Sequence, residues 1–525
     1  MRLRYCYYVG CCRVFEGTLV ALPQARRWGS KMHLKIQKRS GREYLSVVQS
    51  YRQGGKVKTR TIETIGYADS FLDQFEDPIA HFRAYVDQLN RNAIAQRQPI
   101  ELSFGFDDEI EPSAIPPARL GAAIALGCLD ALGIGDYFRA RAGREGFPRH
   151  AGRIFEMLAT ERMMHATSKR ESWTARESFP RACDFTFGEV YESLSCIAQE
   201  RERLDACSLR HWKHVGGEPS TNRVFLICGS YAFPVDGGSR RASIAVALDE
   251  ANMPLGYHDL EGRLEPNQFH EMATVLKKRL GADHAVIVAG GLRDVEPTMN
   301  ELSSTRDGFV LYQRDFKSVP ELEAWADDES GYAPMGGGVF MKWRVSDRTL
   351  QNSAHVPVKE VVLRGGGYAT NYSHAMLVTS ELDLSATAIV QLYRELWRQA
   401  EPFQPLEADF SSMPYPTSPQ DHIRAHFAIC YAAFFALRML RWKTGWQHNA
   451  ADTADALLRM EGVHLQRSYY LFNYRTDVTD DIEEALGVER ARRLRARNEL
   501  RSIPDTVRRS FVTVHRGQNI SQNPR

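Results

Sequence analysis

The chain has 525 residues, of which 43% are hydrophobic and 25% charged, and its formal net charge is +2. That length suits roughly two to four domains whose cores need no disulfide staples, and so small a net charge does not by itself indicate a nucleic-acid partner. Nine cysteines, none in CxxC or CxxH spacing, argue against a zinc site and favour a reducing cytoplasm over a disulfide framework. No run approaches about 18 apolar residues, so we expect no membrane-spanning helix and no membrane partner.

The first 31 residues differ in pattern from the rest of the chain. Residues 1–31 show no clear hydrophobic period, whereas a well-patterned segment begins at Met32. We interpret residues 1–31 as an extension or a disordered arm and Met32 as the natural start; an extra strand on the next domain is the alternative. Apolar and polar residues then alternate between turns at Gly41 and Gly54–Gly55, which predicts a small antiparallel β domain over residues 32–75.

This β domain has a local excess of positive charge. Residues 33–66 contain eight Lys and Arg but only two acidic residues, Glu43 and Glu63. Such a face can lie on nucleic-acid phosphates, and a solvated sheet face explains the charge equally well. The candidate DNA-binding residues here are Lys35, Lys38, Arg39, Arg42, Lys56, Lys58 and Arg60.

Helical periodicity dominates the next part of the chain. Residues 76–117 are predicted to form a helix and a polar, proline-containing linker, and residues 118–222 a helical domain. Lys169 and Arg170 are candidate DNA-binding residues of that helical domain.

Strand patterns return at residue 223. The apolar run Val224–Cys228, followed by Gly229 and Ser230, predicts a strand that is buried on both faces and ends at Cys228. Two alternating stretches, an amphipathic helix and another buried strand ending in glycines come next. Three antiparallel strands, a helix and a further strand are the order of a ribonuclease-H-like sheet, so residues 223–300 are predicted to form the first part of such a core.

The remainder is predicted to contain a β-rich insertion and further helices. The insertion covers residues 301–380, two core helices lie within 381–450, and a helical, basic region with a tail covers 451–525. Eight arginines lie between Val488 and Ser510. Arg492 and Arg493 are the candidate DNA-binding residues among them, and an exposed amphipathic helix is the alternative interpretation.

His422 and His426 are four residues apart on the more apolar of the two core helices. That spacing can ligate a metal ion. No HExxH motif and no third ligand accompany them, so we interpret both as core residues or contacts to a DNA backbone.

Several stretches, taken in order, resemble the DDE transposases of bacterial insertion sequences, in the branch whose ribonuclease-H-like core carries a β-rich insertion before its last catalytic helix. They are SYRQGGKVKTRTIETIG, RMMHATSKRES, ALDEANMPLGYHDLEG, MLVTSELDLSATAIVQLYRELWRQAEPF, DHIRAHFAICYAAFFALRML and YYLFNYRTDVTDDIEEALGV. Each stretch alone is a weak signal. The resemblance rests on their order and spacing from Met32 to Ile503.

The resemblance implies a metal-dependent enzyme that acts on double-stranded DNA at transposon ends. Such transposases use two divalent cations about 4 Å apart to activate water and then a DNA 3′-hydroxyl. Mg²⁺ or Mn²⁺ requires oxygen ligands, so three carboxylates converge on the site. The resemblance also implies a homodimer and a cytoplasmic, nucleoid-associated location.

The three carboxylate positions of the family fall on residues that have no carboxylate. The first, at a strand end in an Asp-x-Thr-like context, falls on Cys228, with Ser230 in the hydroxyl position. The second, just before a Gly-Leu pair, falls on Ala289, or on Gly290 if the turn is shifted by one. The third, a Glu three residues before a Phe, falls on Ala400. A cysteine is a soft ligand and cannot replace an aspartate for Mg²⁺.

Other positions of the family pattern differ as well. Arg263, Leu264 and Pro266 stand where polar residues are expected after LEG, and Gln404 and Glu407 replace a basic pair. In the family that basic pair holds DNA beside the site.

Displaced acidic residues are an alternative source of ligands. Glu401 is one residue from the family position, but it is turned by about 100° from the core-facing stripe of its helix. Pro402 can kink the helix and re-aim Glu401. Asp236, Asp249 and Asp294 lie past strand ends and are interpreted first as turn or surface residues.

The predicted fold class is mixed α/β: a ribonuclease-H-like core with a β-rich insertion, preceded by a small antiparallel β domain and a helical domain. The predicted function is that of a transposase-family protein of an insertion sequence that binds transposon-end DNA but has lost cleavage. A non-catalytic DNA-binding regulator or competitor and an enzyme with relocated acids are the alternatives. In this fold we expect Cys228 and Ala289 to end neighbouring strands, and Ala400 to face them from a helix.

Overall fold

The computed structural model describes residues 32–53, 56–95, 107, 115–235, 238–290, 292, 294–314, 316–350, 355–365, 374–406, 409, 418–465 and 468–512. The side chains of 51–53, 56–57, 92–95 and 396–402 lie outside this description, as does the predicted arm over 1–31. The chain divides into two compact units, Met1–Ala114 and Ile115–Arg525. Helices make up 48% and strands 28%, which confirms the predicted mixed α/β class.

The first unit is a three-stranded antiparallel sheet with a helix packed on it. Its elements are β1 (Met32–Arg39), β2 (Arg42–Gln53), β3 (Lys56–Tyr67), a 3₁₀ helix (Ala68–Phe71) and α1 (Pro78–Ala95), with the strands in the order β1-β2-β3. Leu45 and Val47 of β2 and Val86 of α1 are buried. The Asn90 side chain bonds both the N–H and the C=O of Met32 at 2.9 Å. This arrangement confirms the small antiparallel sheet predicted near the N-terminus.

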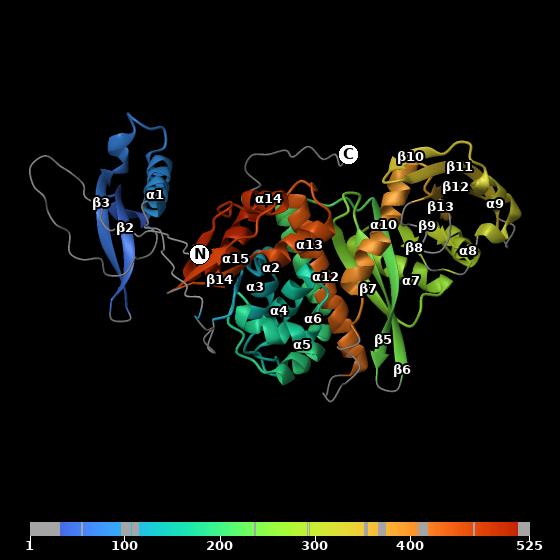
Figure 1. Ribbon diagram of the computed structural model, residues 1–525, viewed down its shortest axis with the longest axis horizontal. Helices are drawn as coiled ribbons and strands as arrows, with labels where there is room; N and C mark the ends of the chain where they lie inside the picture. Colours follow the sequence, from blue (N-terminus) through green and yellow to red (C-terminus); the bar gives the residue numbers. More distant parts are fainter. Residues whose placement is uncertain are drawn as a thin grey trace, which may run out of the picture. The chain divides into compact units, whose positions relative to one another are not determined.

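A nine-stranded sheet organises the second unit (Figure 1). Its strands are β5 (Arg223–Val235), β6 (Gly238–Leu248), β7 (Pro254–Glu261), β8 (His284–Ala289), β9 (Gly308–Gln313), β10 (Ala333–Gly336), β11 (Val339–Thr349), β12 (His355–Arg364) and β13 (His374–Thr379). They lie in the order β10-β11-β12-β13-β9-β8-β5-β6-β7. β5, β8 and β9 run parallel, and the other neighbouring pairs are antiparallel. The strands of the predicted insertion therefore extend the sheet beyond β9.

The strand that begins at Arg223 does not end at Cys228, contrary to the sequence prediction. β5 continues to Val235 because β6 pairs with it from Phe225 to the hairpin at Gly238. Its pairing with β8 does stop at Cys228. The apolar run therefore marks only the half of β5 that has neighbours on both sides, and the less apolar half is a two-stranded extension.

Helices cover both faces of the sheet (Figure 1). They are α7 (Pro266–Leu280) and α8 (Glu296–Thr305) on one face, and α10 (Ala386–Phe403) and α12 (Pro419–Lys443) on the other. Alternate residues of β5 face the two layers: Cys228 lies in the cluster with Phe269 and Met272 of α7, and Ile227 in the cluster with Ile389 of α10. A shorter helix, α9 (Pro320–Asp327), with a preceding 3₁₀ turn (Phe316–Ser318), packs on the insertion strands.

The helical region packs around α12. Its elements are α2 (Leu120–Ala131), α3 (Ile134–Arg139), α4 (Ala151–Met164), α5 (Lys169–Thr174), a 3₁₀ turn (Ala175–Ser178), α6 (Phe187–Gly216) and α13 (Ala450–Arg459). α12 contacts α2, α4 and α6 as well as α10 and β7, so it joins the helical region to the sheet. α2 approaches α13 so closely that a Cβ at Gly121 would lie 1.7 Å from the carbonyl oxygen of Leu457.

Within the part of the chain that the structure describes, α12 is the one helix long and apolar enough to cross a membrane. The apolar pattern of the sequence had predicted no such helix. Ninety-four per cent of its apolar window is buried inside the unit, as in a core helix, so length and composition are weak grounds for a membrane span.

A four-stranded sheet near the C-terminus departs from the all-helical prediction for this region. β14 (Glu461–His464), β15 (Tyr469–Phe472) and β16 (Leu494–Ala496) join β4 (Ala118–Arg119) in the order β16-β15-β14-β4, with α14 (Asp477–Ala485) and α15 (Arg497–Val512) beside them in sequence. These strands have two to four residues each. So short a strand shows no period-2 pattern, and only its partner across the fold defines it.

A buried ion pair joins the helical region to the segment that follows α10. The backbone N–H and the ammonium group of Lys169 donate to the two carboxylate oxygens of Asp409 at 2.7 and 3.0 Å. The side chains of this pair are only 5% and 3% exposed. Removing one partner would leave an uncompensated charge in a low-dielectric interior.

Lys169→Met is therefore expected to lower the free energy of unfolding by about 3–5 kcal/mol, whereas Lys169→Met with Asp409→Leu recovers most of that loss. Urea unfolding followed by circular dichroism measures both. Arg459→Ala, which breaks the exposed pair with Asp455, is the control and should cost less than about 1 kcal/mol. An equal effect of Lys169→Met and the control would contradict a stabilising role for the buried pair.

Candidate functional site

Cys228 and Ala289 are Cα partners in the parallel register of β5 and β8. They lie on neighbouring strands, as the sequence predicts, and theirs is the last pair between these strands. β8 ends at Ala289, so beyond this point the edge of β5 has no β8 backbone beside it. In open α/β sheets, functional sites lie where parallel strands end.

The Cys228 thiol is a poor ligand in this environment. Cys228 is 4% and Ala289 1% exposed, and both lie in the apolar cluster under α7 and α8. Burial raises the pKa of the Cys228 thiol well above its usual range. The thiol is therefore protonated at neutral pH and bonds the Leu226 carbonyl oxygen at 3.4 Å. Two residues on, the Ser230 hydroxyl bonds the Ser243 hydroxyl at 2.6 Å across the hairpin.

The C-terminal end of α10 lies beside the extended half of β5. Phe403, the last residue of α10, has its ring centroid 6.4 Å from that of Phe427 on α12. The Phe427 centroid is in turn 5.5 Å from that of Phe233 and 6.1 Å from that of Tyr231. These β5 residues lie three and five positions beyond Cys228. The last turn of α10 thus ends near the strand edge that follows the Cys228–Ala289 pair.

Buried polar groups hold the chain where α10 ends. Arg162 of α4 donates to the Gln404 carbonyl at 2.8 Å, and His426 Nε2 donates to the Phe403 carbonyl at 3.0 Å. Burial lowers the pKa of His426 well below its usual range, so the imidazole is neutral and acts as a core donor. His422 is likewise buried with a lowered pKa. Both histidines are core residues.

Ala400 and Glu401 lie in this last part of α10, but their side chains are outside the described residues. The described part of α10 packs on the sheet face opposite Cys228. The expectation that Ala400 faces Cys228 and Ala289 therefore stays a prediction. Pro402 does not end the helix, which continues through Phe403.

The other candidate acids have structural contacts where the structure describes them. Asp249 accepts from the Met253 N–H in the β6–β7 turn, and burial raises its pKa to about 6. That turn lies at the opposite end of β5, about 13 Å along the strand from Cys228. Asp294 accepts from the Glu296 N–H at the start of α8. Asp236 lies outside the described residues. Among all the residues that the structure describes, no group of three or more His, Cys, Asp or Glu side chains is arranged to hold a metal ion.

The basic candidates of the first unit are mostly at its surface. Lys35, Lys38, Arg39 and Lys58 are exposed. The remaining ones differ: Arg42 pairs with Asp69, Arg60 donates to Gln49, and the Lys56 side chain is outside the described residues. Exposed cationic side chains therefore lie on the surface of this unit.

The basic candidates of the second unit divide into paired and exposed residues. Lys169 is buried against Asp409, so its charge is neutralised inside the fold. Arg492 pairs with Glu489 and Glu499. Arg170, over the Phe187 ring, and Arg493 are exposed.

Native-state alkylation checks the character of the Cys228 thiol. Because the group is buried and protonated, Cys228 is expected to remain unmodified by iodoacetamide at pH ~8 in the folded protein and to react fully after unfolding. Mass spectrometry of tryptic peptides measures both, with the half-buried Cys196 as an internal comparison. Modification of native Cys228 at the rate of a free peptide thiol would contradict this environment.

Residues 33–99 match the family model described as the IS1634 family transposase N-terminal domain. No curated protein matches the chain. The match covers β1–β3 and α1 of the first unit. That unit is therefore similar to the N-terminal domain of an insertion-sequence transposase, which supports an insertion-sequence transposase for the chain.

Proposed function

We propose that the protein is an insertion-sequence transposase by descent that binds double-stranded DNA at transposon ends but cannot cut it. The similarity of residues 33–99 to a transposase N-terminal domain supports the family. The observation that carries the loss of cleavage is the Cys228–Ala289 pair at the end of β8. Binding as a homodimer, in the cytoplasm at the nucleoid, is part of the proposal.

The strand arrangement supports a ribonuclease-H-like core. β7-β6-β5-β8-β9 is a five-strand sequence in which the first three strands are antiparallel and β5, β8 and β9 are parallel. Helix α7 connects β7 to β8, and α10 packs across β5, β8 and β9. The part from β5 to β8 is the order that the sequence predicted for such a core, whereas β9 lies within residues 301–380, which were predicted to belong to the insertion.

The residues at the first two family positions do not fit a Mg²⁺ or Mn²⁺ pair. Hard cations need oxygen ligands and negative charge. Cys228 offers a neutral buried thiol, and Ala289 offers no donor. Asp249 and Asp294 have other partners, while Asp236 and the Glu401 side chain lie outside the described residues. Two divalent cations need more negative charge than one displaced carboxylate supplies.

DNA binding without cleavage suits a regulator or competitor that occupies element ends. The specific observation in favour is that the β5–β8 edge is packed with apolar side chains, which have no use at a metal site. The exposed cationic residues of the first unit supply the phosphate contacts.

DNA binding is expected to depend strongly on salt because each lysine or arginine on a phosphate displaces a counterion. Lys35→Ala with Lys38→Ala should lower the slope of log affinity against log salt by about 2. Fluorescence anisotropy with a labelled duplex measures the slope from ~50 mM salt upward. Arg203→Ala with Arg459→Ala, which removes two exposed charges elsewhere, should leave the slope unchanged. No binding of linear DNA at the lowest salt would refute every DNA-based function.

Cleavage is expected to be undetectable in the unmodified protein with Mg²⁺ or Mn²⁺, measured as nicking of a supercoiled plasmid. The change Cys228→Asp, Ala289→Asp and Ala400→Glu together should restore metal binding, while each single change should not. Thermal unfolding gives a readout that does not depend on activity: Mn²⁺ at about 100 times its Kd should stabilise the triple variant by about 2.7 kcal/mol.

Two results would overturn this assignment. Metal-dependent nicking by the unmodified protein that disappears in Glu401→Gln would show that a displaced acid completes the site. A folded triple variant that neither binds Mn²⁺ nor nicks DNA would show that these three positions do not form a metal site.

A further inference from the structure

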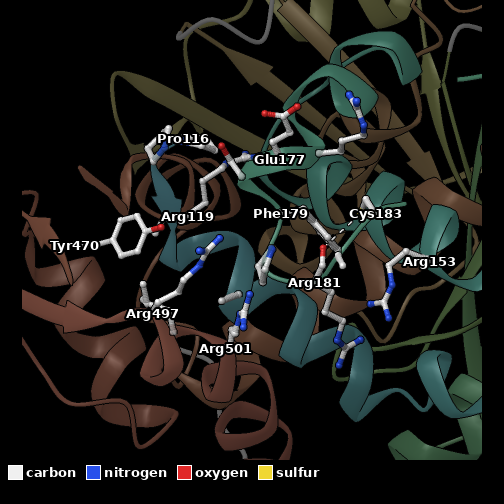
Figure 2. A pocket seen from close by; sticks show the side chains of 18 of the residues that line it. Pro116, Arg119, Arg153, Glu177, Phe179, Arg181, Cys183, Tyr470, Arg497 and Arg501 are labelled. Atoms are coloured by element: carbon white, nitrogen blue, oxygen red, sulfur yellow. Dashed lines mark hydrogen bonds between the residues drawn. The ribbon is translucent and has the colours of Figure 1, made fainter. Parts of the chain in front are cut away.

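An arginine-lined cleft of about 940 Å³ opens in the second unit (Figure 2). Arg497 and Arg501 of α15 lie on one side of it, with Phe179, Arg181 and Cys183 on the other. Six arginines and two acidic residues line the cleft: Arg119, Arg153, Arg176, Arg181, Arg497 and Arg501, with Glu177 and Asp184. The cleft is distinct from the β5–β8 edge, since none of its lining residues comes from the nine-stranded sheet.

Three of the arginines have carboxylate partners within the fold. These pairs are Arg119 with Glu161 and Glu461, Arg153 with Glu156, and Arg181 with Asp130 and Glu156. The Glu161, Glu156 and Asp130 side chains are only 3–4% exposed, so they lie beneath the cleft surface. A guanidinium has five N–H donors. Arg153 and Arg181, whose side chains are 33% and 22% exposed, therefore keep donors available at the cleft, whereas Arg119, 7% exposed, is occupied by its carboxylate partners.

The other three arginines have no carboxylate partner among the described residues. Arg497 and Arg501 are exposed, and neither side chain makes a hydrogen bond or ion pair with any residue described. Arg176 lies 3.9 Å from the Trp173 ring centroid and donates only to the Trp173 carbonyl oxygen. Leu500, between Arg497 and Arg501 in the sequence, is buried at 8% exposure. Its packing sets the orientation of α15, so that both of these arginines lie at the cleft.

The geometry suits a chain of phosphates better than a single anion. Arg497 and Arg501 are four residues apart, about 6 Å along the helix axis, and so repel each other unless an anion lies between them or beside them. Arg176 comes from a different segment that also lines the cleft, the 3₁₀ turn Ala175–Ser178. Arginine binds phosphate through its planar pair of N–H donors. Three such groups from two segments of the chain can hold successive phosphates of one strand.

We propose that this cleft binds the phosphodiester backbone of DNA through Arg176, Arg497 and Arg501. The inference rests on the proposed function only for its choice of DNA as the ligand. It adds a DNA contact within the second unit, on residues that belong neither to the basic sheet of the first unit nor to the β5–β8 edge. Glu177 and Asp184 form no ion pair with these three arginines among the described residues, so the cationic groups remain available.

The test is Arg497→Ala with Arg501→Ala in the full chain, titrated with a labelled random-sequence duplex and with its single strand over a range of salt. Affinity at ~100 mM salt should fall about tenfold, and the slope of log affinity against log salt should drop by about 2. Arg497→Lys with Arg501→Lys should keep the slope, because the charge remains. Arg203→Ala with Arg459→Ala removes the same charge elsewhere and should behave like the unmodified protein. Unchanged thermal unfolding shows that the variants fold, as expected for exposed side chains without partners.

Each result decides the question. Loss of affinity on either form of DNA, with the control unchanged, supports the cleft. Tight binding by the unmodified protein and by Arg497→Ala with Arg501→Ala alike overturns the cleft and leaves the proposed function standing. No DNA binding by the unmodified protein overturns both. Stabilisation by inorganic pyrophosphate that disappears in this variant, with DNA binding intact, identifies a small phosphorylated ligand and overturns the DNA assignment.

Discussion

Parallel pairing between β5 and β8 is the constraint on which the second unit depends. It places β5 and β8 side by side in the middle of the sheet, although 49 positions of sequence separate Val235, the end of β5, from His284, the start of β8. It also requires α7 to cross between the two strands. β6 and β7 then extend the sheet from β5 on one side, while β9 and the insertion strands extend it from β8 on the other. Because the pairing stops at Cys228 and Ala289, the same constraint defines the edge at which a site can form.

Buried polar contacts position the C-terminal end of α10, which lies near that edge. Arg162 and His426 hold the carbonyl groups of Gln404 and Phe403, and Lys169 holds Asp409. Each of these donors is buried, so each would be costly without its acceptor. The chain where α10 ends is therefore tied to the helical region as well as to the sheet. These contacts hold the end of α10 without a carboxylate at Cys228 or Ala289.

In the C-terminal region the fold pairs some arginines with carboxylates and leaves others exposed at the cleft. Arg495 of β16 is buried in an ion pair with Glu483 of α14, and Arg492, two residues before β16, is partly buried in a pair with Glu499 of α15. Arg497 and Arg501 lie at the cleft with no such partner among the described residues. From the sequence, Arg492 and Arg493 were selected in this run as DNA-binding candidates, and Arg497 and Arg501 were not singled out. Their spacing of four residues with the apolar Leu500 between them is the signal that separates them, because it places both on one helix face.

The sequence by itself determined the classes of element and where apolar cores form. Alternation predicted the sheet of the first unit, and the run Val224–Cys228 predicted the part of β5 that is paired on both sides. The neighbouring placement of Cys228 and Ala289 also followed from strand order. Tertiary structure alone decided how far β5 extends, since that length depends on β6, and it alone formed β4 and β14–β16, which are too short to carry a period. It also decided which cations are neutralised: Lys169 and Arg497 are both basic in the sequence, but one meets Asp409 inside the fold and the other meets no carboxylate among the described residues. A charge is available for function only when folding brings no opposite charge to it. For Lys169 that opposite charge comes from Asp409, which is 240 positions away in the chain.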